Sequence, residues 1–90
     1  MCYTYVVRFT WDRKKAALNL RKHGVSFTEA ATVFADLLAA MLQDAMDAAR
    51  SLLVGQSEKG RVLITVFIES PEDTIRIISA RRYIAREEAL

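Results

Sequence analysis

The rest of the chain can be arranged around one segment, Asp73-Thr74-Ile75-Arg76-Ile77-Ile78-Ser79-Ala80-Arg81-Arg82. Its isoleucines are β-branched and suit a half-buried, pleated surface, so the segment begins as a predicted strand. Ser79 is a residue type that often begins helices, because its side chain can accept a hydrogen bond from a free backbone N–H group. The segment therefore predicts a last strand that gives way to a C-terminal helix over Ala80–Leu90.

The arginines of this segment, Arg76, Arg81 and Arg82, indicate an anion site. A half-buried guanidinium group loses hydration that it must recover elsewhere. Its planar set of donors matches phosphate well, so three arginines around one strand end favour phosphate binding. The alternative is that all three side chains reach solvent or pair with nearby carboxylates of Asp73, Glu87 or Glu88.

Length and composition predict a single globular domain over residues 1–90. The chain has 90 residues, of which 52% are hydrophobic, enough for one core but little more. Its one cysteine, Cys2, excludes an internal disulfide and suits a reducing cytosol. No segment approaches the roughly 20 apolar residues of a membrane span, and no secretory signal is present. We therefore expect a cytoplasmic protein without a membrane partner.

Charge is unevenly distributed although the net charge is only +2. Residues 1–28 hold six Lys/Arg and one acidic residue, residues 29–75 hold three and eight, and residues 76–90 hold four and two. Basic ends around an acidic middle indicate one face suited to a polyanion. Patches of this size also occur on proteins that bind no nucleic acid.

The first half of the chain predicts a strand and two helices. Tyr3–Phe9 is rich in strand-forming residues. Asp12 can begin a helix over Arg13–His23, and Gly24 can end it in a left-handed conformation. Ser26-Phe27-Thr28-Glu29 fits a capping box for a second helix. Its core stripe, at helical spacing, is Phe27, Ala30, Ala31 and Phe34.

The second half predicts a meander of strands. Leu52–Gly55 and Val62–Ile68 are apolar runs separated by a short loop, and the second is apolar on both faces, as in a central strand. Ser70–Asp73 forms the next turn. The segment Leu37–Leu53 is ambiguous, because its Ala, Leu and Met residues favour continued helix. Such a helix would leave little sheet for the other strands to join, and it could mediate self-association.

No motif in the sequence predicts a metal or cofactor site. There is no Gly-rich phosphate loop, no pair of cysteines and no Ser-His-Asp spacing. The single histidine, His23, ends a predicted helix, where it could cap the helix or act as an acid or base. We therefore expect no cofactor.

Two runs of the sequence resemble the BrnT toxin family. The first half carries Phe9-x-Trp11-Asp12, then Asn19-Leu20-x-Lys22-His23-Gly24-Val25-Ser26-Phe27-x-Glu29-Ala30 and Val33-Phe34-x-Asp36. The second half carries Gly60-Arg61-x-Leu63 and Arg76-Ile77-Ile78-Ser79-Ala80-Arg81. The similarity covers roughly residues 9–88 and is poor in the middle.

This resemblance implies a toxin of a type II toxin–antitoxin pair. The implied fold is α+β, similar to RelE-like ribonucleases, with a small antiparallel sheet, two N-terminal helices and a C-terminal helix. Deferring to the family, we expect a short strand at about Ala39–Leu42. The implied activity is metal-independent RNA cleavage that arrests translation. The implied partner is a BrnA-like antitoxin, in a heterotetramer of two toxins and two antitoxins.

Such cleavage needs a proton acceptor, cations for the developing negative charge and a proton donor. Histidine is the side chain that most readily exchanges a proton near neutral pH, so His23 is the acid–base candidate. The other expected catalytic residues are Arg76, Arg81 and Arg50, and the expected RNA-binding residues are Lys22, Arg61 and Arg82.

The chain also departs from the family pattern. Leu37 replaces a common proline, and Ala45–Ala49 replaces an acidic segment that contains proline and histidine. Ala49 stands where a glutamate is frequent, and an arginine common before the last turn is missing near Ser70. These losses favour a competing hypothesis, a non-catalytic interaction module whose basic face docks an acidic protein or regulates transcription.

Overall fold

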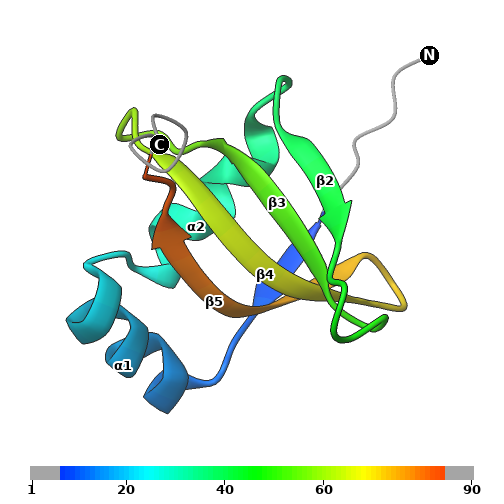
Figure 1. Cartoon of the computed structure of the whole chain (residues 1–90). Coiled ribbons are helices and arrows are strands. Elements are labelled where there is room, and N and C mark those ends of the chain that lie inside the picture. The colour runs from blue at the N-terminus through cyan, green and yellow to red at the C-terminus, as the bar shows by residue number, and fades with distance from the viewer. Residues whose placement is uncertain (1–6, 85–90) are drawn as a thin grey trace.

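The computed structural model describes residues 7–84, which form a five-stranded mixed sheet and two helices (Figure 1). In chain order the elements are β1 (Arg8–Thr10), α1 (Arg13–His23), α2 (Phe27–Thr32), the 3-10 turn η1 (Val33–Ala35), β2 (Ala40–Gln43), β3 (Ser51–Gln56), β4 (Val62–Ser70) and β5 (Thr74–Arg82). The predicted α+β class is confirmed. The likeness to RelE-like ribonucleases stays a prediction.

The strands lie in the order β1-β5-β4-β3-β2. β1 is parallel to β5, whereas all other neighbouring strands are antiparallel. The prediction of a purely antiparallel sheet is therefore wrong at β1. β1 and β5 lie at opposite ends of the described chain, so no hairpin dictates their relative direction. The first four residues of the strand predicted at Tyr3–Phe9 lie outside the described residues.

α2 packs behind one face of the sheet, and α1 lies beside the edge of β5 (Figure 1). Aromatic residues form the centre of the core between α2 and the sheet: the rings of Phe34 and Phe67 meet edge to face, with centroids 4.9 Å apart. The predicted core role of Phe27 and Phe34 is confirmed. The buried hydrophobic residues are Val25, Phe27, Ala30, Val33, Leu53, Leu63, Phe67, Ile77 and Ala80.

α1 begins and ends where the sequence predicted, and α2 begins where it predicted. The Asp12 carboxylate accepts from the backbone N–H of Lys14 at 2.8 Å and of Lys15 at 3.3 Å, and Gly24 adopts φ 70° after the last turn of α1. Ser26 Oγ accepts from the N–H of Glu29 at 3.0 Å. Only this half of the capping box forms, because the Glu29 carboxylate is turned towards Arg61 and Ser57.

The ambiguous segment contains a strand, as the family resemblance implied. η1 ends before Asp36, whose carboxylate accepts from the N–H of Leu38 at 3.0 Å and of Gln56 at 2.7 Å. The second bond ties the end of the helical region to β3. A Cβ atom on Gly55 would lie 2.7 Å from the Cβ of Ala39, so glycine allows this close approach. Tertiary contacts therefore override the helix propensity of Leu37–Leu53.

The predicted C-terminal helix is wrong where the structure tests it. Ser79 does not cap a helix: it pairs with Val66, and β5 continues through Arg82. Backbone hydrogen bonds to β4 hold Ala80–Arg82 in the sheet. The local sequence cannot show that this partner strand lies beside them. The rest of that prediction, from residue 85 to 90, lies outside the described residues. Within residues 7–84, no helix is both long and apolar enough to cross a membrane.

Candidate nucleic-acid interface

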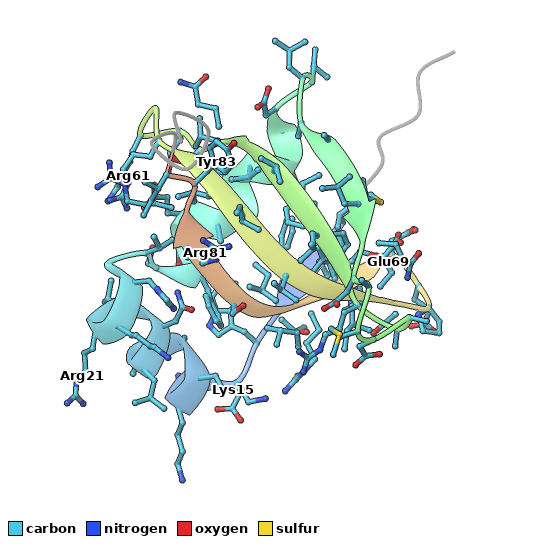
Figure 2. The ribbon with its side chains drawn as sticks, in the orientation of Figure 1. Lys15, Arg21, Arg61, Glu69, Arg81 and Tyr83 are labelled. Carbon is cyan, nitrogen blue, oxygen red and sulfur yellow. The ribbon has the colours of Figure 1, made fainter. Side chains whose placement is uncertain are left out.

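A groove with basic walls runs between α1 and β5. It consists of two adjoining pockets of about 670 and 680 Å³ that share Lys22 and His23. We call it the basic groove. Figure 2 labels Lys15 and Arg21 on α1, Arg81 on β5 and Tyr83 just after β5 among the residues that line it. Within the part of the chain that the structure describes, no carboxylate lines either pocket. The basic side chains in the walls are Lys15, Arg21, Lys22, His23, Arg81 and Arg82.

Asn19 joins the two walls of the groove. β1 covers only the first three residues of β5, Thr74–Arg76, and no other strand of residues 7–84 pairs with the rest of that edge. The Asn19 side chain takes this place: its Nδ2 donates to Ala80 O at 2.8 Å and to Val25 O at 3.0 Å, and its Oδ1 accepts from Ala80 N at 3.1 Å. A buried amide in a helix thus completes a strand edge and holds α1 against β5.

The role of Asn19 was missed in the sequence. The available signal was its position three residues after Ala16, on the inward stripe of α1, where a polar side chain needs buried partners. Asn19 is only 7% exposed. Periodicity can show that such a residue faces inward, but not which backbone groups it will meet.

A β-bulge shapes the β5 wall. Val66 pairs with Ser79 and Phe67 pairs with Ile77, which leaves Ile78 without an opposite residue. An extra residue of this kind bends its strand and increases the local twist. Ile78 and Ser79 thereby line the groove together with α1.

Four predicted site residues come together in one pocket, Lys22, His23, Arg81 and Arg82. Arg81 and Arg82 are exposed and His23 is partly buried. Among the described residues, no ion pair neutralises any of the four. Lys22 and His23 lie in the last turn of α1, where the helix dipole interacts favourably with the charge of Lys22. The helix end and the strand end can therefore gather cations without a carboxylate between them.

Arg76 lies further along β5, away from that pocket. It pairs with Ile68 and Arg81 pairs with Ile64, so the two arginines are separated by about 13 Å at 3.3 Å per residue along β4. Arg76 also contributes to the lowered pKa of Asp12, which is held down mainly by the backbone N–H groups of Lys15 and Lys14.

Arg50 also lies outside the basic groove. It precedes β3 and forms an exposed ion pair with Asp47, with a 3.5 Å separation. The next residue, Ser51, pairs with Phe67, so Arg50 is near the same end of the sheet as Arg76. The predicted catalytic residues thus fall into two groups, one in the groove and one at the opposite end of the sheet.

Arg61 lies in neither of these two groups, because its side chain is bound to other residues of the fold. Its guanidinium group donates to both carboxylate oxygens of Glu29 and to Gly24 O. Ser57 Oγ also donates to Glu29, at 2.7 Å. We call these residues the Glu29–Arg61 cluster. Hydrogen bonding to Arg61 and Ser57 holds the pKa of Glu29 below its ordinary value against the opposing effect of burial, and the same contact raises the pKa of Arg61.

Metal-ligating side chains do not gather in the described residues: no group of three or more His, Cys, Asp or Glu residues is placed to hold an ion. What residues 7–84 do offer is a dense set of cations that face a groove. Arginine, lysine and histidine together can bind phosphate and move protons. The fold and the site define a small α+β protein with a groove lined by basic side chains.

The family of the chain follows from comparison with known proteins. Residues 11–87 match the family described as the ribonuclease toxin, BrnT, of type II toxin–antitoxin systems, and the chain belongs to this family. The crystal structure of the Brucella abortus ribonuclease toxin BrnT superposes with a TM-score of 0.73 at 20% identity, covering 88% of this chain and 99% of that one. That likeness supports the fold. No curated protein sequence matches.

Proposed function

We propose that this chain is a ribonuclease toxin that binds RNA in the basic groove and cleaves it by attack of a 2′-hydroxyl on the adjacent phosphate. The observation that carries the proposal is one pocket lined by Lys22, His23, Arg81 and Arg82 and, among residues 7–84, by no carboxylate. Basic side chains on such a surface attract the phosphates of a nucleic-acid strand, and each phosphate contact adds to the binding affinity. Membership of a family of ribonuclease toxins supports the assignment of RNA as the substrate.

The reaction needs groups for proton transfer and for charge stabilisation. His23 takes the proton of the attacking 2′-hydroxyl. Arg81 and Arg82 stabilise the negative charge that develops on the phosphate oxygens. The departing 5′ oxygen takes a proton from Lys22 or from the hydroxyl of Tyr83, both in the wall of the same pocket. The products are a 2′,3′-cyclic phosphate and a free 5′-hydroxyl.

The remaining predicted residues take other roles in this proposal. Arg76 and Arg50 lie too far along the sheet to hold the reacting phosphate together with Arg81, so they contact neighbouring phosphates. Arg61 is already bound to Glu29 and supports the fold. RNA cleavage by this chain would arrest translation, and a BrnA-like antitoxin would neutralise it in an assembly of two toxins and two antitoxins.

A growth assay tests the proposal. Induction of the wild-type chain in bacteria should arrest growth, and His23→Gln and Arg81→Ala should relieve the arrest. Arg13→Gln is the matched control, because Arg13 is exposed on α1 and lines neither pocket. The purified wild-type chain should also cleave RNA in the presence of a chelator. Soluble protein that neither arrests growth nor cuts RNA would contradict the proposal.

The departures from the family pattern keep a second candidate function, a non-catalytic interaction module. Ala45–Ala49, which lacks the family's histidine and glutamate, lies in the turn between β2 and β3, next to Arg50 and outside the basic groove. If the reaction takes place at the Arg50 end of the sheet, this chain lacks its acid–base groups. Soluble wild-type chain that binds a partner protein but neither cuts RNA nor arrests growth would favour the interaction module.

A further inference from the structure

We propose that the face of the sheet opposite α2 docks an amphipathic helix with an acidic flank, supplied by the antitoxin partner. Figure 1 looks onto this face. Cross-strand pairs lie on the same face of a sheet, and the pairs Leu52–Val66 and Val54–Ile64 alternate with the buried pair Leu53–Thr65. We call this surface the open face. Its apolar residues are Leu42, Leu52, Val54, Ile64, Val66 and Ile68.

The composition of β4 indicates that both faces of the sheet are covered in the working protein. Antiparallel sheets with one solvated face usually alternate apolar and polar residues. In β4, the residues that point away from α2 are instead Val62, Ile64, Val66 and Ile68. On the neighbouring edge strand, Leu42 is 52% exposed. The contiguous apolar surface is the kind that marks a protein interaction site.

The charge of the open face selects an acidic partner. On β5, Arg76 lies opposite Ile68 and Arg81 lies opposite Ile64, so two arginines flank the apolar surface on one side. No carboxylate takes part in the cross-strand pairs of this face. Carboxylates along one side of a docking helix would meet these arginines, which would orient the helix and speed its association.

The shape of the face suits a helix. Four strands, β2 to β5, span about 14 Å at 4.7–4.9 Å between neighbours, and a helix with its side chains is about 10–12 Å wide. The residues that β3 and β4 place on this face include no aromatic ring, so these two strands offer no platform on which single-stranded RNA could stack. A second copy of this chain that docked through the same face would bring the same arginines to meet Arg76 and Arg81.

Docking at this face would block the proposed reaction, and to that extent the inference rests on the proposed function. Arg81 belongs both to the open face and to the wall of the basic groove. A helix that pairs its carboxylates with Arg81 removes that arginine from the phosphate. Inhibition would then need no contact with His23.

Two synthetic peptides test the charge and the location of the site. Both have about 18 residues, long enough for a marginal helix, and share a leucine stripe; one carries glutamates on its flanks and the other carries lysines. Methyl NMR of the full chain follows Leu52, Val54, Ile64 and Val66, with Leu53 and Leu63 of the core face as internal references. The glutamate peptide should shift only the open-face methyl groups and bind at least about tenfold more tightly than the lysine peptide.

Variants make the test specific. Arg76→Glu combined with Arg81→Glu should reverse the preference between the two peptides. Leu52→Gln should weaken binding of the glutamate peptide at least about tenfold. Its matched control is Leu20→Gln, because Leu20 is a 50% exposed leucine on α1, away from this face. Unchanged core-face methyl signals show that each variant is folded.

Several outcomes would overturn the inference. Equal affinity for the two peptides, or shifts outside the open face, would refute an acidic docking site there. A single-stranded RNA that shifts these methyl groups more than the peptides do would make the face an RNA surface. A stable homodimer in light scattering, with the open face protected, would assign it to a second copy. Growth arrest and RNA cleavage are measured separately, so failure of the proposed function leaves the peptide result readable.

Discussion

Arg61 and Arg81 lie at the same end of the sheet, before β4 and near the end of β5, yet their surroundings differ. Arg61 donates to Glu29, which is 2% exposed, and to Gly24 O, so its charge is matched inside the Glu29–Arg61 cluster. Arg81 is exposed in the basic groove, and among the described residues it has no carboxylate partner. The same side chain therefore supports the fold in one place and faces solvent, ready for an anion, in the other. The difference comes from what each strand end packs against.

The largest effect is expected on stability in the Glu29–Arg61 cluster. Arg61→Ala should lower the free energy of unfolding by about 3–5 kcal/mol, because it leaves a buried carboxylate without its partner. Arg82→Ala should change it by less than about 0.5 kcal/mol, as expected for an exposed side chain. Urea unfolding followed by circular dichroism measures both. Equal destabilisation by the two substitutions would contradict the conclusion that the Glu29–Arg61 cluster stabilises the fold more than the arginines of the basic groove do.

The next effect is expected on catalysis in the basic groove. Arg81→Ala should reduce kcat for RNA cleavage about 10²- to 10³-fold, the usual loss when one donor to a developing negative charge is removed. Arg76→Ala should cost less than Arg81→Ala but clearly more than Arg13→Ala or Lys14→Ala, because solvated helix charges contribute little. Single-turnover cleavage of a short RNA gives these rates. Equal losses at all four positions would indicate diffuse electrostatic binding instead of a site.

The pH dependence of stability should come in part from the cluster. Glu29 has a folded pKa below its ordinary value of 4.5, first because of its hydrogen bond with Arg61. A carboxyl group of this kind stabilises the fold above its unfolded pKa, and the contribution is lost as the pH falls through the folded pKa. The free energy of unfolding should therefore begin to fall below about pH 5. Glu29→Gln should make this decline shallower, whereas the exposed control Glu69→Gln should not. Identical acid profiles for wild type and Glu29→Gln would contradict the assignment.

The smallest effect is expected on the salt dependence of RNA binding. Lys22→Gln removes one cation from the basic groove, so the slope of log K against log salt should fall by about 0.7, the value for one phosphate of a single strand. Lys59→Gln, exposed in the turn between β3 and β4, should leave the slope unchanged. Fluorescence anisotropy across a salt series tests both variants. A similar change in both slopes would mean that the groove is no better a phosphate site than the rest of the surface.

Local signals in the sequence were enough for the helix ends and the strand run. Asp12, Gly24 and Ser26 act through neighbours two to four residues away, so their geometry is specified within one turn of chain. The strand β4 also needed no tertiary information, because its β-branched and aromatic residues between Val62 and Ile68 favour a strand by themselves. The strand at Ala40–Gln43 came from family resemblance against its helix propensity, since the bond between Asp36 and Gln56 that ends the helical region joins residues 20 positions apart.

The location of the candidate site depended on the tertiary structure. Ser79 and Ala80 are residue types that occur both at the start of a helix and within a strand. Their pairing with β4 places them in a strand. The hydrogen bonds of Asn19 to Ala80, 61 residues away, then set α1 against β5 and created the basic groove. Arg61, which was predicted to bind RNA, donates to the carboxylate of Glu29, 32 residues away. Sequence spacing shows which residues carry charge, but whether a charge is neutralised or available depends on partners that are distant in the chain and adjacent only in the fold.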